Sequence, residues 1–202
     1  MSVSEGRRRP ATWIVIAEIT VVAVCMVIVS GGRVGSAEQS VFRAINGLPD
    51  ALHAPMWVFQ IFGSLAFVVV AALVAIVVRR FRLALALAVS IPLKLALEWW
   101  VVKALVERER PAYTVADAVI RDSSASPLGF PSGHAIFAFA AAGLLAPHFG
   151  RRGTIVVYVL ALLSGVGRVY LGAHNPLDVV AGAALGLALA AALGAPPAPR
   201  PA

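Results

Sequence analysis

Long runs of apolar residues limit what this chain can fold into more than any other feature of its sequence. A helix needs about 20 apolar residues to cross the hydrocarbon layer of a bilayer. Six stretches come close to that length: 12–30, 56–78, 83–104, 134–149, 154–170 and 176–194. Only 13% of the residues are charged, about half the proportion in soluble domains. We therefore expect an all-α fold, a polytopic membrane helical bundle with about six transmembrane helices.

No linker or internal repeat separates these stretches, so they are predicted to form one membrane domain over residues 12–194. Residues 1–11 are predicted to be a cytoplasmic tail, and the Pro/Ala-rich residues 195–202 are predicted to be disordered. Three arginines before an apolar stretch imitate a secretory signal, but this stretch is long and contains Glu18. A retained first span is the better interpretation.

The distribution of arginine predicts which loops face the cytoplasm. The formal net charge is +7, and cytoplasmic loops of membrane proteins collect Arg and Lys. Arginines cluster in the N-terminal tail and in the second and fourth connections, at positions 7–9, 79, 80, 82, 151 and 152. We therefore expect a multi-pass protein of the plasma (inner) membrane, with both termini in the cytoplasm and no nucleic-acid partner.

The other three loops, 31–55, 105–131 and 171–175, then lie on the outer side. Apolar residues in 31–55 recur at helical spacing, so this loop is predicted to contain a short helix on the membrane surface. Cys25 is the one cysteine, so no disulfide can form within the chain. Nothing in the sequence indicates an oligomeric state.

Three clusters of chemically active residues fall at the outer ends of the predicted spans. They are Lys103 with Arg110-Pro111, then Pro131-Ser132-Gly133-His134, then Arg168 with His174 and Asp178. Under the predicted topology all three meet on one side of the membrane. Motif spacing and arginine distribution are separate arguments, and they agree.

The cations Lys103, Arg110 and Arg168 would repel one another unless an anion with several charges binds between them. Arginine forks match phosphate oxygens, and lysine adds a point charge. Ser132 is a good N-cap for the fourth span and Gly133 lets the backbone approach closely, so a helix N-terminus faces the same anion. These five residues are the predicted phosphate-binding site, with no metal and no cofactor.

His134 and His174 supply the two roles that cleavage of a phosphate ester needs near neutral pH. One ring can attack phosphorus and the other can protonate the departing oxygen. Asp178 falls just beyond His174, where it can accept a hydrogen bond from one ring nitrogen and leave the other free as nucleophile. The three are the candidate catalytic residues.

Two further charged groups are interpreted as structural. Lys94 and Glu98 are spaced i, i+4 inside the third span. Intramembrane charges are functional candidates, but a mutually neutralising pair that faces other helices is favoured here. Arg108, with Glu107 and Glu109, is interpreted as a solvated run of charges.

The complete pattern resembles the type 2 phosphatidic acid phosphatase family, also called the lipid phosphate phosphatase or acid phosphatase/vanadium haloperoxidase superfamily. It runs Lys103-(six residues)-Arg110-Pro111, Pro131-Ser132-Gly133-His134, and Arg168-(five residues)-His174-(three residues)-Asp178. The resemblance covers roughly residues 35–194. One motif alone is weak, whereas three in order with matching spacing are specific. The family's third motif usually begins Ser-Arg, whereas here it begins Gly167-Arg168.

The resemblance implies that His174 attacks phosphorus and forms a phosphohistidine, which Asp178 orients. His134 would protonate the leaving oxygen, and water would then release phosphate. The groups implied to hold the phosphoryl oxygens, without a metal, are Lys103, Arg110, Arg168 and the amides of Ser132 and Gly133.

The expected function is hydrolysis of a lipid phosphate or diphosphate at the outer leaflet. A polyprenyl diphosphate of the undecaprenyl or decaprenyl type, as in recycling of the cell-wall carrier lipid, is the preferred substrate. Phosphatidic acid and phosphatidylglycerophosphate remain open. A rival from another class is a non-catalytic membrane protein that binds anionic lipid through the same cations, but such a protein would not need both histidines. A transporter is disfavoured because the polar residues cluster at one face.

Overall fold

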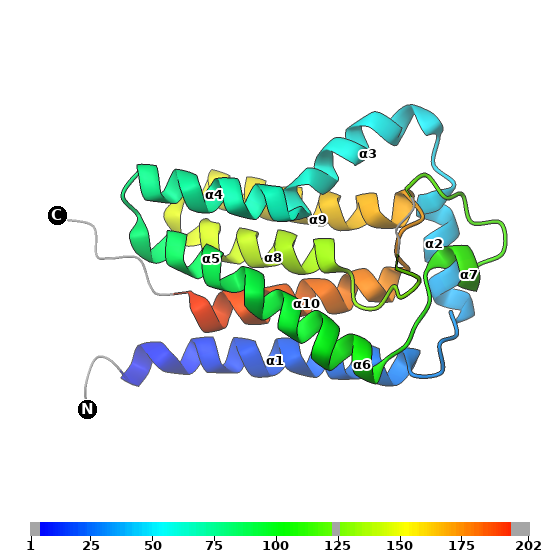
Figure 1. Cartoon of the computed structure of the whole chain (residues 1–202), viewed down its shortest axis with the longest axis horizontal. Helices are drawn as coiled ribbons and strands as arrows, with labels where there is room; N and C mark the ends of the chain where they lie inside the picture. The colour runs from blue at the N-terminus through cyan, green and yellow to red at the C-terminus, as the bar shows by residue number, and fades with distance from the viewer. Residues whose placement is uncertain (1–4, 123–125, 195–202) are drawn as a thin grey trace.

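The computed structural model describes residues 5–122 and 126–194, with side chains from residue 12 onward. The long elements in these ranges are all helices (Figure 1). They are α1 (Glu5–Val29), α2 (Ser36–Asn46), α3 (His53–Gln60), α4 (Leu65–Val77), α5 (Phe81–Ala96), α8 (Gly133–Leu145), α9 (Arg151–Tyr170) and α10 (Pro176–Leu193). Short helical pieces connect them: η1 (Asp50–Leu52), η2 (Ile61–Gly63), the π-helix η3 (Leu97–Val102), α6 (Lys103–Leu105), α7 (Pro111–Thr114) and η4 (Ala146–His148).

The all-α membrane bundle is confirmed, although its spans are less uniform than expected. Four segments in the described ranges are each long and apolar enough to cross a membrane: Thr12–Val29, Phe81–Leu105, Arg151–Tyr170 and Pro176–Leu193. The predicted fourth span is a shorter apolar helix, Gly133–His148. α1 starts at Glu5, inside the expected N-terminal tail, and the expected tail 195–202 lies outside the described residues. The division into tail, domain and tail stays a prediction.

The predicted second span, 56–78, is not one straight helix. It is bent by 55° between Gly63 and Leu65, because Ser64 takes an extended conformation and caps α4 by accepting a hydrogen bond from the Phe67 amide. The bend presses Gly63 onto α8, where a Cβ at this position would come 2.5 Å from the His134 carbonyl oxygen. This bend, which hydropathy alone could not indicate, therefore places Gly63 in close contact with the first turn of α8.

α10 lies between α1 and α8 in the bundle (Figure 1). Its contact with α8 depends on two glycines one helical turn apart. A Cβ at Gly186 would come 2.4 Å from the Ile136 carbonyl oxygen, and one at Gly182 would come 2.6 Å from the Ser132 carbonyl oxygen. Small residues at this spacing let membrane helices approach closely. The approach brings the first turns of α8 and α10 side by side.

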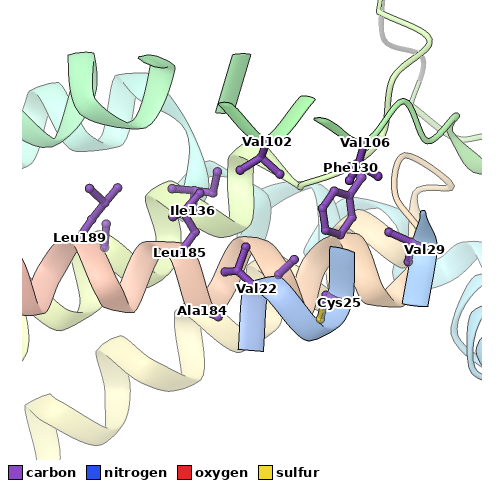
Figure 2. Packing of buried hydrophobic residues seen from close by; sticks show 12 residues of the cluster. Val22, Cys25, Val29, Val102, Val106, Phe130, Ile136, Ala184, Leu185 and Leu189 are labelled. Atoms are coloured by element: carbon purple, nitrogen blue, oxygen red, sulfur yellow. The ribbon is translucent and has the colours of Figure 1, made fainter. Parts of the chain in front are cut away.

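Apolar side chains fill the space around this contact. Val22, Cys25 and Val29 of α1 meet Leu185 and Leu189 of α10 in one buried cluster (Figure 2). The same cluster reaches Val102, Val106 and Phe130 at the end that carries the loops. The predicted motifs lie at that end, whereas the α4–α5 turn and the start of α9 lie at the other (Figure 1).

The helix expected in the first outer loop is α2, and its last turn anchors the second outer loop. The Asn46 amide group donates to the Val119 and Tyr170 carbonyl oxygens at 2.9 and 3.0 Å. Arg121 donates to the same Tyr170 oxygen at 2.9 Å. Gly172 has a φ of +72°, and a Cβ there would come 2.5 Å from the Val119 oxygen. This turn after α9 therefore needs glycine, and it directs the chain toward His174.

Candidate active site

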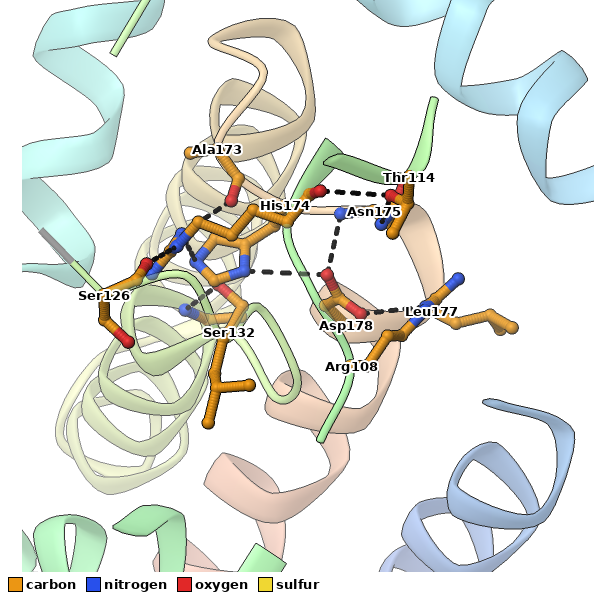
Figure 3. A network of polar contacts seen from close by, with 12 residues as sticks. Arg108, Thr114, Ser126, Ser132, Ala173, His174, Asn175, Leu177 and Asp178 are labelled. Carbon is orange, nitrogen blue, oxygen red and sulfur yellow. Dashed lines mark hydrogen bonds and ion pairs between the residues drawn. The ribbon is translucent and has the colours of Figure 1, made fainter. Parts of the chain in front are cut away.

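His174 lies in the turn between α9 and α10, with 2% of its surface exposed. Its Nε2 atom lies 3.2 Å from Nη1 of Arg110, and Figure 3 shows Asp178 on the other side of the ring. A guanidinium can only donate hydrogen bonds, so Nε2 must accept here and the ring proton belongs on Nδ1. The ring therefore presents a lone pair toward Arg110, the direction from which an anion would arrive.

Asp178 lies behind the opposite nitrogen of the same ring. Its Oδ2 is 3.7 Å from Nδ1 of His174, which is longer than a hydrogen bond. That oxygen accepts from the Asn175 amide at 2.8 Å, as the capping box of α10. Catalytic hydrogen bonds are often long in the empty enzyme and tighten around substrate. His174 and Asp178 are therefore arranged as a nucleophilic histidine and the carboxylate that orients it.

The environment keeps the His174 ring uncharged. Burial, together with the positive charges of Arg168, Arg110 and Lys103, lowers the pKa of this imidazole well below its usual value. The ring is therefore neutral throughout the physiological range, and a nucleophilic imidazole must be neutral.

The three predicted cations lie within electrostatic range of the His174 ring. Arg110 is held by two hydrogen bonds to backbone carbonyl oxygens. Its Nε donates to that of Ser126 at 2.7 Å, and its Nη1 donates to that of Ala173 at 2.6 Å. Burial and the nearby charge of Arg168 lower the pKa of the Arg110 guanidinium. Lys103 is 4% exposed, and its Nζ lies 3.4 Å from the Leu128 oxygen. This concentration of buried positive charge favours a multiply charged anion.

Arg168 has two partners that the sequence did not indicate. It donates from Nη1 to Gln60 at the end of α3 and to Oδ2 of Asp122 at 2.7 Å. Its Nε is buried and has no hydrogen-bond partner among the described residues. Asp122 thus occupies one side of a guanidinium that still has a free donor. The bend before α4 brings Gln60 here, and the Gly63-Ser64 pair inside the apolar run was the signal that could have indicated it.

The second motif differs in part from expectation. Ser132 caps α8, but its amide donates to the Asp178 carbonyl oxygen at 2.9 Å, so this amide cannot also hold a phosphoryl oxygen. Ser132 instead ties α8 to α10. Gly133 and His134 begin α8, and the first amides of a helix have no partner within it. His134 lies within electrostatic range of Arg168 and His174.

Lys94 and Glu98 form the expected ion pair, and it lies beneath the second motif. The Glu98 carboxylate also reaches Nζ of Lys103 at 3.4 Å, so it joins two buried lysines. A Cβ on Gly133 would come 2.7 Å from Nζ of Lys94. Glycine at this position therefore leaves room for the ion pair directly under the start of α8.

The interpretation of Arg108 as a solvated residue is wrong. Its side chain is fully buried and contacts Asp178 and Glu38, while its neighbours Glu107 and Glu109 are exposed. Val106 begins an extended segment, in which alternate side chains point the same way. Arg108 therefore points inward like Arg110. The sequence alternates Glu and Arg from Glu107 to Arg110, and this period of two, in phase with the motif residue Arg110, was the signal that could have revealed it.

Pairing across the second outer loop keeps this segment in place. Glu109 and Leu128 form an isolated antiparallel bridge, and the Gly129 amide donates to the Arg108 oxygen at 2.7 Å. The first motif is thereby fixed against the residues that precede the second. Within 5–122 and 126–194, no group of three or more His, Cys, Asp or Glu side chains could hold a metal ion.

Comparison with known proteins identifies the family. The model of the PAP2 superfamily matches residues 81–195, more than half of the chain and all three motifs. This chain belongs to the PAP2 superfamily. Decaprenylphosphoryl-5-phosphoribose phosphatase of Mycolicibacterium smegmatis is 40% identical over 82 residues, 41% of this chain and 43% of the relative. Phosphatidylglycerophosphatase B of Bacillus subtilis is 35% identical over 99 residues, which are 44% of this chain and 46% of the relative. The chain thus aligns with less than half the length of these curated relatives.

Solved structures share the PAP2 fold. Aquifex aeolicus LpxE superposes with a TM-score of 0.63 and 26% identity, covering 76% of this chain and 92% of that one. The PAP2-type phosphatidylglycerolphosphate phosphatase of Bacillus subtilis gives a TM-score of 0.67 and 22% identity, covering 87% and 93%.

The departure from the family pattern at Gly167 has a local cause. A Cβ here would come 3.1 Å from the Met56 carbonyl oxygen of α3. Glycine lets α3 lie close against α9, and this contact stands next to the pairing of Gln60 with Arg168. Gly167, which replaces the usual serine, is thus part of the contact that places α3 beside Arg168.

Proposed function

We propose that this protein is a membrane phosphatase that removes phosphate from a lipid phosphate or diphosphate through a phosphohistidine intermediate, without a metal. One observation carries the proposal: Nε2 of His174 faces Arg110 at 3.2 Å, with Asp178 behind the ring. Buried cations around a neutral nucleophile suit a phosphoryl group, whose transfer is promoted mainly by positioning and charge stabilisation.

The reaction would proceed in two displacements. Nε2 of His174 attacks phosphorus as the bond to the leaving oxygen breaks, and His134, protonated when the substrate anion binds beside it, gives that oxygen its proton. Asp178 stabilises the charge that develops on the His174 ring. His134, now neutral, takes a proton from water, and the hydroxyl oxygen attacks the phosphohistidine. Phosphate leaves and both histidines return to their starting states.

Two features favour a lipid substrate in the outer leaflet. α8 is the shortest predicted span and begins nearer the middle of the bundle than α9 ends or α10 begins (Figure 1), which supports a site recessed to about head-group depth. The arginine-rich turns at 79–82 and 151–152 lie at the opposite end of the bundle, which favours a site that faces away from the cytoplasm.

A polyprenyl diphosphate is the substrate that we propose first. One relative is named for a decaprenyl-linked phosphate, which supports a long isoprenoid chain. The alternative is a glycerol lipid, either phosphatidic acid or phosphatidylglycerophosphate, and the second relative is named for the latter.

Phosphate release from a panel of lipid phosphates by the purified protein tests the proposed function. We expect release in EDTA and inhibition by vanadate, because vanadate can adopt the five-coordinate geometry of phosphoryl transfer at a cage of Lys103, Arg110 and Arg168. Polyprenyl diphosphate should give the highest kcat/KM. Complete loss of activity in chelator, restored by metal, would contradict the proposed chemistry. Lipid binding without release by any panel member would favour the non-catalytic alternative.

Cysteine labelling tests the proposed orientation. In a Cys25→Ser background, Glu107→Cys in the second outer loop should react with an impermeant thiol reagent in intact cells. Val78→Cys, exposed at the α4–α5 turn, should react only after lysis. Both wild-type side chains are exposed, so accessibility within the fold is matched. Reversal of the two results would put the site on the cytoplasmic side and favour phospholipid biosynthesis.

A further inference from the structure

We propose that Arg108 and Glu38 form a charge brace that keeps Asp178 ionised and correctly oriented behind His174. Arg108 is then a positioning residue for the nucleophile, although it touches neither His174 nor the expected position of the phosphoryl group. The inference rests on the proposed function of His174 and Asp178.

The geometry of Arg108 carries the inference. Its side chain is fully buried, and Nη1 donates to Oδ1 of Asp178 at 2.8 Å (Figure 3). The same guanidinium donates to both oxygens of Glu38, at 3.1 and 2.6 Å. One buried cation thus joins a carboxylate of α2 to a carboxylate at the start of α10.

Asp178 needs such a partner because its side chain has no exposure to water. A buried carboxylate without a counter-charge takes up a proton instead of remaining ionised. A protonated Asp178 could not stabilise the charge that develops on His174. With Oδ1 held by Arg108, only Oδ2 is left to face the ring, so the brace sets the orientation of the carboxylate as well as its charge.

Glu38 completes the brace from the other side. Its carboxylate accepts the Leu177 amide at 2.9 Å in addition to Arg108. α2 is thereby fastened to the first turn of α10, one residue from Asp178. A bidentate arginine between two carboxylates has a fixed geometry that a lysine ammonium cannot reproduce.

Other ionisable groups face Asp178 at longer range. They are Cys25 of α1, Lys103 of α6, Arg110 of the second outer loop and His174 itself. Among the described residues, only Arg108 gives the carboxylate a hydrogen bond that carries charge. Removal of Arg108 should therefore change the ionisation of Asp178 more than removal of any of these.

The pH profile separates positioning from simple loss of structure. In Arg108→Gln, Asp178 loses its cation and becomes protonated at neutral pH. We expect kcat at pH 7 to fall about 100-fold, less than the roughly 10⁴-fold fall on loss of a triad carboxylate. KM should change little, and the acid limb of the pH–rate profile should move to higher pH, so that part of the activity returns in alkali.

Two further variants keep the test independent of whether Arg108→Gln folds. Glu38→Gln removes a negative charge from the brace, which favours the ionised Asp178, so its acid limb should move to lower pH. Arg108→Lys keeps the charge but loses the bidentate contact, so it should retain an acid limb near that of wild type with reduced kcat. The exposed neighbours Arg43→Gln and Glu107→Gln are charge-matched controls and should shift nothing. The brace would be refuted if Arg108→Gln lost activity equally at every pH, or if the acid limb of Glu38→Gln moved to higher pH.

Thermal unfolding in detergent gives a readout that needs no turnover. In Arg108→Gln the unpaired carboxylates take up protons on folding, so the deficit in Tm relative to wild type should shrink as pH falls from about 8 to about 5. A deficit that does not depend on pH would refute the brace, whatever the enzyme does. If the wild type releases no phosphate while this dependence is present, the proposed function fails and the brace stands.

Discussion

Replacement of His174 by glutamine should abolish phosphate release, with a fall in kcat of at least about 10⁴-fold. The reason is local: within the part of the chain that the structure describes, His174 is the residue whose ring nitrogen faces Arg110, and glutamine cannot form the intermediate. Steady-state release of phosphate from the preferred lipid is the measurement. His148→Gln, in η4 beyond the far end of α8, is the matched control and should retain full activity.

His134→Ala should behave differently because its proposed role is proton transfer. We expect a fall of about 10²- to 10⁴-fold with a lipid phosphate, since general acid catalysis contributes about that much. The loss should be much smaller with an aryl phosphate, whose oxygen leaves without a proton. Normal turnover in His174→Gln, or an equal loss in His134→Ala for both leaving groups, would refute the assigned roles.

Arg168→Gln should lower kcat/KM by about 10²- to 10³-fold, the loss typical when one donor to a developing oxyanion is removed. The free, buried Nε and the contact with Gln60 indicate a guanidinium held ready for an anion. Arg168→Lys should recover little, because a lysine cannot offer the same fork.

Asp122→Asn is the contrasting variant, since Asp122 accepts a hydrogen bond from Arg168 at 2.7 Å and we propose that it competes with substrate for this guanidinium. We expect tighter inhibition by vanadate and a lower KM, with Gln60 still holding the guanidinium. Steady-state kinetics of Arg168→Gln and Asp122→Asn, with and without vanadate, measure these effects. Weaker vanadate inhibition in Asp122→Asn would show that Asp122 supports the cation site rather than competing for it.

Much of the site could be predicted because its residues occur at fixed spacing next to apolar runs. Lys103, Arg110, His134, Arg168 and His174 all lie at one end of the bundle, as span ends and charge distribution predicted. The pairing of Lys94 with Glu98 was also predictable, because it depends only on the helical repeat.

The contacts that were not predicted depend on the path of the backbone between the motifs. Arg108 was misjudged because its segment was taken as solvated, although its exposed and buried positions alternate. Gln60 reaches Arg168 through a bend at Ser64 that hydropathy does not record. Glu38 of α2 and Asp122 of the second outer loop lie far from their partners in sequence. Ser132 was expected to donate to phosphate, but the close approach of α8 to α10 uses its amide.

The central claim is that the phosphoryl group passes through His174, and trapping the intermediate tests it most directly. Purified protein would be mixed with lipid phosphate carrying a radiolabelled phosphoryl group, quenched in alkali within the first turnover, digested and mapped. We predict label on the peptide that contains His174, stable in alkali and lost in acid, and no label in His174→Gln. Label on any other residue, or turnover with no labelled protein at any quench time, would contradict the account.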